Sequence, residues 1–174
     1  MKILWRLNAL AARFSGNNLK IPVSNFGIVE PRNVYRSACP SLGALAKMKD
    51  DLGIKELVDL RILSESEFLR RKRQVESLGI HYTNIPMDEY NEIPQDTLKR
   101  VIGIVAWPGN HPILVHCKGG VHRTGLVILA LRMWRMGYNW NEAFAEAKKF
   151  HFYSENGHDG VLRSMKRAGG QPLN

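Results

Sequence analysis

The segment ILVHCKGGVHRTG, residues 113–125, places a cysteine and an arginine six positions apart with two glycines between them. Apolar residues precede the cysteine and follow the arginine, which predicts a buried strand, a loop and a helix. Successive amides of such a loop can point inward, and the N-terminus of the helix adds partial positive charge, so that an anion is bound. Because Gly119 and Gly120 permit a close approach of the backbone, the pattern indicates a cradle for phosphate.

Three side chains of this segment have matching chemistry. The inward amides, the helix dipole and the Arg123 cation all lower the pKa of a thiol at Cys117, which favours a thiolate nucleophile. The planar guanidinium of Arg123 can hold two phosphoryl oxygens at once. The hydroxyl of Thr124 can donate a hydrogen bond to the sulfur as it leaves a phosphocysteine. Together they predict phosphoryl transfer to sulfur and back to water.

The same residues allow two other interpretations, a metal site and a buried structural cysteine. A metal site would use His116, Cys117 and His122, but neighbouring residues of a strand point to opposite faces, so no metal or other cofactor is expected. His116 is expected to support the loop from behind. A buried structural cysteine would not explain why the strand, the glycines and the helix start all agree with one anion cradle.

The surrounding chain predicts one α/β domain over residues 1–174, with a central mixed sheet of about four or five strands flanked by helices. Residues 1–25 are expected to form an amphipathic helical extension and residues 169–174 a flexible tail. Strands are expected within residues 33–38, 54–61, 80–86 and 113–117. Helices are expected within residues 41–53, 64–78, 95–107, 124–137, 139–150 and 161–167.

The composition restricts the partners. A net charge of +9 favours anionic ligands, but the basic residues are dispersed without interleaved aromatics, so a nucleic-acid reader is not expected. Two cysteines exclude a disulfide framework and favour a cytoplasmic protein. No apolar stretch approaches the ~20 residues that span a bilayer. Membrane-surface contact through residues 1–25, whose polar face is basic, is a less favoured alternative. The sequence predicts no oligomeric state.

The loop HCKGGVHRTG resembles the phosphate-binding loop of the cysteine-dependent protein tyrosine phosphatase superfamily. From Val34 to Arg167, the order VYRSACP, ELVDLR, acid-bearing loop and cradle is similar to the small dual-specificity and atypical phosphatases. The resemblance implies a two-step mechanism that needs neither metal nor cofactor, with Cys117 as nucleophile, Arg123 as phosphate clamp and Thr124 assisting the second step. It also implies that phosphate is bound by the loop of Lys118, Gly119, Gly120, Val121 and His122.

A general acid must protonate the leaving oxygen and then activate water. The loop MDEYNEIP, residues 87–94, offers three carboxyls. Asp88 is preferred because its separation from Cys117 is similar to that in small members of the superfamily. Glu89 is the alternative within the same loop, and Asp96 is a remoter one.

The expected substrate is a phosphorylated protein or a small phosphorylated molecule. The resemblance favours phosphotyrosine or mixed phosphoprotein substrates. Phosphoinositide phosphatases of the superfamily have a similar lysine at the position of Lys118, which with His122 adds positive charge, so an inositol phosphate or sugar phosphate is the second hypothesis. A non-catalytic phosphate-binding module is the third, and the presence of Cys117, Arg123 and Thr124 argues against it.

Three further features of the sequence are the arginines Arg36 and Arg61, a basic run and the second cysteine. Arg36 and Arg61 resemble recurrent family positions and are expected to be structural. The run Arg70 to Arg73 is expected to be a solvated helix face. Cys39 could lie on the same side of the sheet as the cradle, which leaves a reversible disulfide with Cys117 as a hypothesis and a packed structural thiol as the alternative.

Overall fold

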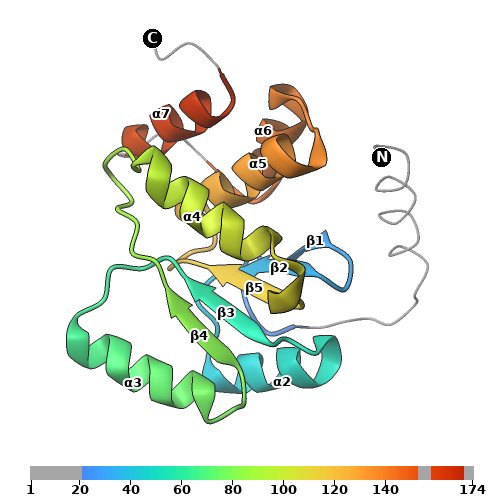
Figure 1. Ribbon diagram of the computed structural model, residues 1–174, viewed down its shortest axis with the longest axis vertical. Helices are drawn as coiled ribbons and strands as arrows, with labels where there is room; N and C mark the ends of the chain where they lie inside the picture. The colour runs from blue at the N-terminus through green and yellow to red at the C-terminus, as the bar shows by residue number, and fades with distance from the viewer. Residues whose placement is uncertain (1–20, 153–157, 171–174) are drawn as a thin grey trace.

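The computed structural model describes residues 21–152 and 158–170. Five strands form one sheet in the order β1-β2-β5-β3-β4, in which β1 is antiparallel to β2 and the other neighbours are parallel (Figure 1). The strands are β1 (Gly27–Glu30), β2 (Val34–Ser37), β3 (Glu56–Asp59), β4 (His81–Asn84) and β5 (Ile113–His116). The α/β prediction with a mixed sheet of four or five strands is confirmed.

Helices cover both faces of the sheet. The helices α2 and α3 pack on one face, and α4 to α7 lie on the other (Figure 1). Their bounds are α2 (Leu42–Leu52), α3 (Glu65–Glu76), α4 (Gln95–Ala106), α5 (His122–Met136), α6 (Trp140–Lys149) and α7 (Asp159–Ala168), and a short 3₁₀ helix covers Pro108–Asn110. Parallel strands require such crossover connections, because a tight turn cannot join them.

Helix starts follow from local sequence. Ser64 and Glu67 form a capping box at the start of α3, as their spacing predicts. Asn139 and Glu142 form a second capping box at the start of α6. The helix α5 begins at His122, two residues before the predicted start, and is buried continuously from Arg123 to Leu131. It is the central helix of its layer.

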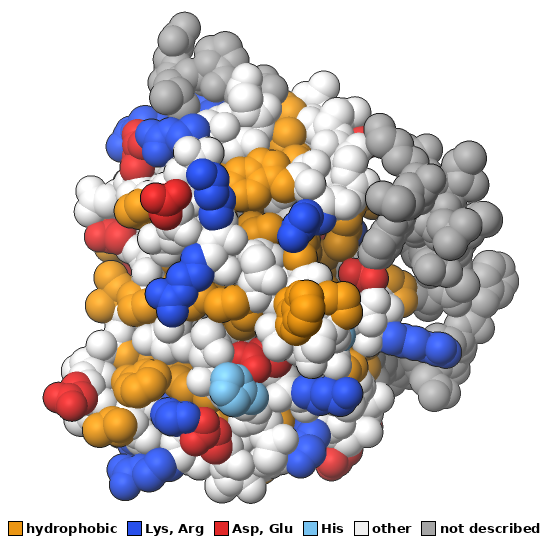
Figure 2. All heavy atoms as spheres, viewed as in Figure 1, with side chains coloured by type: hydrophobic (Ala, Val, Ile, Leu, Met, Phe, Trp, Pro, Cys, Tyr) orange, Lys and Arg blue, Asp and Glu red, His pale blue; other side chains and the backbone are white. Residues whose placement is uncertain are grey.

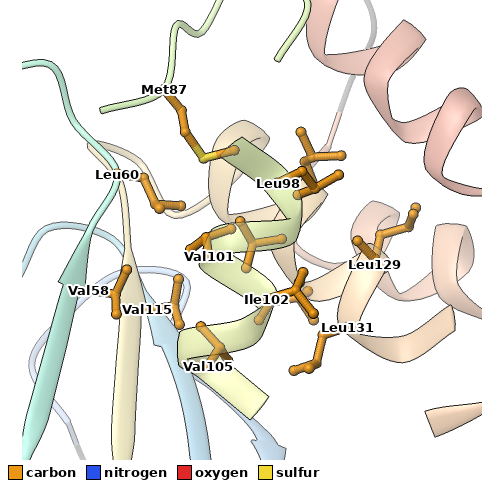
Figure 3. Close-up of a cluster of buried hydrophobic side chains, with 14 of the residues drawn as sticks. Val58, Leu60, Met87, Leu98, Val101, Ile102, Val105, Val115, Leu129 and Leu131 are labelled. Carbon is orange, nitrogen blue, oxygen red and sulfur yellow. The ribbon is translucent and has the colours of Figure 1, made fainter. Parts of the chain in front are cut away.

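The strand β5 lies in the middle of the sheet and is buried on both sides. Leu114 packs with α2 and α3, whereas Ile113 and Val115 pack into the other cluster, as the two-residue period of a strand requires. Figure 3 shows this second cluster, with Val58 and Val115 of the sheet beside Leu98, Val101, Ile102 and Val105 of α4 and Leu129 and Leu131 of α5. This packing fixes the position at which the chain leaves β5.

The parallel strands β2, β5 and β3 end together. His116 is in register with Ser37 on one side and with Asp59 on the other. The residues that follow each strand therefore meet at one edge of the sheet, where ligands bind in open α/β folds. Cys117 emerges at the centre of this edge.

Two sequence expectations fall largely outside the described residues. Of the predicted helical extension over residues 1–25, residues 1–20 are not described, and residues 21–25 form bends and a turn. Of the predicted tail over residues 169–174, residues 169–170 form a turn and the rest are not described. Within the described parts of the chain, no helix is long and apolar enough to cross a membrane. On the face shown in Figure 2, basic side chains are scattered among acidic and apolar ones.

Candidate active site

Cys117 follows the last residue of β5, and residues 118–121 form the loop that leads into α5. Cys117 is only 2% exposed. The N-terminal turn of α5 begins directly after the loop, so its partial positive charge is directed at the same place. The predicted order of strand, loop and helix is thus present around the cysteine.

Three successive carbonyls of the loop are bound from outside. The bonds run from Cys39 N to Lys118 O at 3.0 Å, from Asn25 Nδ2 to Gly119 O at 2.7 Å and from Arg36 Nη2 to Gly120 O at 2.5 Å. In a trans peptide unit the carbonyl and the amide N–H point in opposite directions. Outward carbonyls at residues 118–120 therefore orient the amides of residues 119–121 inward, which is the geometry of an anion cradle.

Gly120 is required by this conformation. Its φ is +71°, and a Cβ at this position would lie 2.5 Å from backbone atoms of Ser37 and Ala38. Both the left-handed backbone and the close approach to β2 exclude a side chain. The bond from Arg36, a residue only 1% exposed, locks the same peptide. Arg36 thus has the structural role expected of it.

His116 lies behind the loop in a fully buried position. Its Nδ1 donates to the carbonyl of Cys117 at 3.0 Å, and its Nε2 lies 3.6 Å from Asp59 Oδ2. Burial lowers the pKa of His116 to about 4, so the ring is neutral at pH 7. It contacts the backbone side of Cys117, the position expected of a loop support.

Asp59, the last residue of the neighbouring strand β3, lies beside His116 and is itself held by two side chains. Arg61 forms an ion pair with Asp59 at 2.6 Å, and the hydroxyl of Tyr82 donates to the same carboxylate at 2.9 Å. Burial raises the pKa of Asp59, but the hydrogen bond from Arg61 and the neighbouring charges outweigh it and hold the pKa below its usual value. The carboxylate is therefore ionised, and Arg61 has the structural role expected from the sequence.

Arg123 lies at the start of α5 and is 5% exposed. It donates from Nη2 to Glu89 Oε2 at 2.8 Å and from Nη1 to the carbonyl of Met87 at 3.3 Å. Its Nε and the Thr124 hydroxyl are buried without hydrogen-bond partners. Such groups are costly to bury, and near an anion cradle they are available to a bound substrate. Arg123 and Thr124 thus lie in the first turn of α5, directly after the loop that begins at Cys117.

Asp88, the preferred general acid in the sequence, is placed differently from Glu89. Its carboxylate accepts from Tyr90 N at 2.8 Å, from Asn91 N at 3.2 Å and from Asn91 Nδ2 at 2.9 Å. These bonds, chiefly the one from the Tyr90 backbone, hold the pKa of Asp88 below its usual value, which disfavours the protonated form that an acid needs. These bonds make Asp88 a poorer candidate for the general acid, and Glu89, the alternative in the same loop, is therefore the better one.

The remaining acidic candidates point elsewhere. Glu92 pairs with Arg163 and Arg167 of α7. The side chain of Asp96 is 97% exposed in the first turn of α4 and lies 3.6 Å from Lys99. Among these candidates within the described residues, Glu89 is the one that forms an ion pair with Arg123, whereas Arg123 acts on Asp88 only as a nearby charge.

Sequence reasoning missed the helix α7 as a part of the site. His158, just before α7, donates from Nδ1 to the carbonyl of Glu89 at 2.8 Å, and its ring stacks on that of His122 at 3.5 Å between centroids. Further bonds from α7 run from Gly160 N to Tyr90 O and from Ile93 N to Ser164 Oγ. No local pattern could reveal contacts between segments so far apart in the chain.

The two cysteines are both free thiols. Burial raises the pKa of Cys39, while the nearby Arg61 and Arg71 act in the opposite direction. Cys39 is partly buried, and its backbone holds the phosphate loop through Lys118. The hypothesis of a reversible disulfide with Cys117 stays a prediction.

Comparison with known proteins agrees with this geometry. A model of the tyrosine phosphatase family matches residues 20–163. Inositol diphosphatase DSP1 of Oryza sativa subsp. japonica is 32% identical over 126 residues, which cover 68% of this chain and 53% of the relative. Inositol diphosphatase SIW14 of Saccharomyces cerevisiae is 31% identical, covering 78% of this chain and 48% of the relative. The chain therefore spans about half the length of these two relatives.

Solved structures show the same fold. The core catalytic domain of the PP-IP phosphatase SIW14 from S. cerevisiae, in complex with citrate, has a TM-score of 0.67 and 29% identity, covering 78% of this chain and 81% of that one. TpbA of P. aeruginosa has a TM-score of 0.70 at 20% identity, covering 92% and 94%. With the family match over most of its length and an assembled phosphate loop, the chain belongs to the tyrosine phosphatase family.

Proposed function

We propose that the protein hydrolyses phosphate groups through a phosphocysteine on Cys117. The observation that carries this proposal is the set of three outward-bound carbonyls, which turn the loop amides toward the space above a buried thiol. Such preorganised donors stabilise the charge that develops on phosphoryl oxygens. The combination of nucleophile, anion cradle and arginine clamp supports a phosphatase.

The reaction has two displacements. The Cys117 thiolate attacks phosphorus, the bond from phosphorus to the leaving oxygen breaks, and the general acid gives its proton to that oxygen. Arg123 binds the equatorial oxygens in the transition state. Water then attacks the phosphocysteine after losing a proton to the same carboxylate, and phosphate leaves. The Thr124 hydroxyl donates a hydrogen bond to the departing sulfur.

Glu89 is the proposed general acid. Its carboxylate lies 2.8 Å from Nη2 of Arg123, and its side chain is 29% exposed. A phosphate bound at Arg123 therefore lies beside the Glu89 carboxyl, which can then exchange a proton with the leaving oxygen and with the attacking water.

The favoured substrate class is an inositol phosphate that carries a diphosphate. The relatives named inositol diphosphatases, from rice and yeast, support this choice at 32% and 31% identity. Phosphotyrosine or mixed phosphoprotein is the second candidate. It is supported by the match to the tyrosine phosphatase family and by the putative tyrosine-protein phosphatase OCA1 of Meyerozyma guilliermondii, which is 29% identical over 138 residues.

The test is a turnover panel with the wild type and Cys117→Ser. The wild type is expected to hydrolyse p-nitrophenyl phosphate and, more efficiently, a diphosphoinositol polyphosphate. The serine variant is expected to fold and to lose turnover of both, because a hydroxyl ionises far less readily than a thiol and is the weaker nucleophile. A serine variant that keeps more than a few per cent of the rate contradicts the phosphocysteine. A preference for phosphotyrosine peptide selects the second candidate.

The cytoplasmic location belongs to the same proposal. It is supported by the small number of cysteines, two, and by their free thiols. Fractionation of cells that express the full chain, with antibody detection, tests it. Recovery in a membrane or extracellular fraction contradicts it.

A further inference from the structure

A basic pocket lies beside the phosphate loop, on the face of the sheet covered by α3. Its volume is about 320 Å³. It is lined by Cys39, Arg61, Leu63, Glu67, Arg70, Arg71 and Gln74. Four of these residues recur at positions 67, 70, 71 and 74, which share one face of α3. The sequence predicts a solvated basic face over residues 70–73; Arg70 and Arg73 are exposed, whereas Arg71 is partly buried, and Arg70 and Arg71 both line the pocket.

The arginines of the pocket have unused capacity for an anion. Arg71 donates from Nη2 to the carbonyl of Pro40 at 2.8 Å, but its Nε is buried without a hydrogen-bond partner. Arg70 is exposed at the rim. Arg61 pairs with Asp59, and its side chain remains 23% exposed. A guanidinium with a free edge is the group that binds a phosphate through two parallel hydrogen bonds.

The acidic group in the lining does not cancel this charge. Glu67 is the only acid among the lining residues, against three arginines. Its carboxylate already accepts from Ser64 N at 2.8 Å and from Ser64 Oγ at 2.6 Å in the capping box. With three arginines against this one acid, the lining keeps an excess of positive charge.

The pocket and the cradle share a wall. Cys39 lines the pocket, and its backbone N–H donates to the carbonyl of Lys118, the residue directly after the nucleophile. On the other side, Arg61 contacts Asp59, which lies 3.6 Å from His116, the support of the cradle. The pocket therefore borders the phosphate loop through Cys39 and the support of that loop through Arg61.

We propose that the pocket is a second anion subsite, which binds another phosphate of a polyphosphorylated small molecule while the cradle holds the phosphate to be cleaved. The inference rests on the proposed function. The lining favours this ligand over a phosphotyrosine peptide, because Leu63 is its only aliphatic side chain and the other lining groups, apart from the thiol, are charged or amide. An aromatic or aliphatic peptide side chain would find little apolar surface there.

The experiment compares two substrates on three variants. p-Nitrophenyl phosphate carries one phosphate and reaches only the cradle, whereas a diphosphoinositol pentakisphosphate can reach both sites. Arg70→Gln and the double variant Arg70→Gln with Arg71→Gln remove pocket cations. Arg73→Gln is the matched control, since Arg73 is exposed on the same helix but does not line the pocket.

The expected result is a fall of about tenfold or more in kcat/KM for the polyphosphate in the double variant, which is the scale of one lost charge-assisted hydrogen bond. Turnover of p-nitrophenyl phosphate should stay within about twofold, and Arg73→Gln should change neither substrate by more than that. If the double variant does not fold, the single variant Arg70→Gln, which alters an exposed residue, still tests the proposal. In this variant too, kcat/KM is expected to fall for the polyphosphate but not for p-nitrophenyl phosphate.

Other outcomes overturn the inference. An equal fall for both substrates would assign Arg70 and Arg71 to support of the cradle, and no fall in any variant would leave the pocket without a role in binding. A wild type that cleaves p-nitrophenyl phosphate but not the polyphosphate rejects the subsite and keeps the phosphatase. A wild type that cleaves neither rejects the proposed function itself.

Discussion

The two loops that form the candidate site are held in different ways. The phosphate loop, residues 117–122, begins at a central buried strand and ends in the first turn of α5. The acid-bearing loop, residues 87–94, leaves strand β4 near the sheet edge and is held mainly by bonds from His158 and α7. The phosphate loop joins two core elements and is also bound by Asn25, Arg36 and Cys39 in and beside β2, whereas the acid-bearing loop is bound by residues at and before α7, more than sixty residues away in the sequence.

The two loops are therefore expected to serve different steps: the phosphate loop binds the phosphate, and the acid-bearing loop transfers the proton. The phosphate loop is rigid because its carbonyls, its glycine and its buried support all fix the backbone, so it can bind an anion without rearrangement. The acid-bearing loop presents Glu89 to Arg123 by an ion pair in which the Glu89 side chain is 29% exposed. A phosphate bound at Arg123 competes with this ion pair, but not with the bonds from His158 and α7. We expect substitutions in the two loops to affect different kinetic parameters.

The largest loss among the variants that retain Cys117 is expected for Arg123→Lys. One ammonium cannot replace a guanidinium that binds two oxygens, so kcat should fall by about 10² or more. Steady-state kinetics with p-nitrophenyl phosphate checks this. A change in KM alone would show that Arg123 acts only in ground-state binding and would remove the distinction between the two loops.

Glu89→Gln should lower kcat by about 10², the lower range for loss of a general acid, and should flatten the basic limb of the pH profile. KM should fall, because the amide no longer competes as a carboxylate for Arg123. Asp88→Asn is the matched comparison and should keep the basic limb. If the limb instead persists in Glu89→Gln and disappears in Asp88→Asn, the assignment from the sequence was the correct one.

A smaller loss is expected for His158→Phe. The phenyl ring can keep the stacking on His122 but loses the bond to the Glu89 carbonyl, so kcat should fall by about tenfold or less with little change in KM. His158→Gln, which retains a donor, should recover part of the rate. Equal losses in both variants would show that the imidazole matters for another reason than this hydrogen bond.

The last prediction concerns His116, which supports the phosphate loop, and it is measured as a change in stability with pH and not as a change in turnover at neutral pH. The folded pKa of His116, about 4, is below its ordinary value, so the folded protein resists protonation of this ring. The corresponding stability is present above the unfolded pKa near 6.5 and is lost as the pH falls toward 4, by roughly 2 kcal/mol between pH 7 and pH 5. Urea unfolding at both pH values measures it. In His116→Asn, the free energy of unfolding should depend less on pH than in the wild type. If its pH dependence is unchanged, the loss of stability in acid comes from another group.

The phosphate loop could be predicted because its determinants are adjacent in the sequence. Cys117, the glycines and Arg123 lie within one strand-loop-helix unit, and periodicity alone predicted most strands and helices around it. The sequence could not decide between Asp88 and Glu89 as the proposed general acid, since the choice depends on backbone bonds that hold Asp88 and on the reach of Arg123. The pocket wall formed by Arg70 and Arg71 was missed for a similar reason. A run of charges on a helix does not show which member faces a neighbouring strand end.

The three donors that turn the loop carbonyls outward have a consequence for the order of folding. Asn25, Arg36 and Cys39 belong to the first described residues of the chain, whereas the carbonyls that they bind belong to residues 118–120. During synthesis, this early segment leaves the ribosome long before its partner loop exists. Contacts of such sequence separation form slowly, because a long loop must close before they form. Catalytic competence is therefore gained late in folding, and in a refolding experiment the recovery of turnover should lag behind the recovery of helical signal.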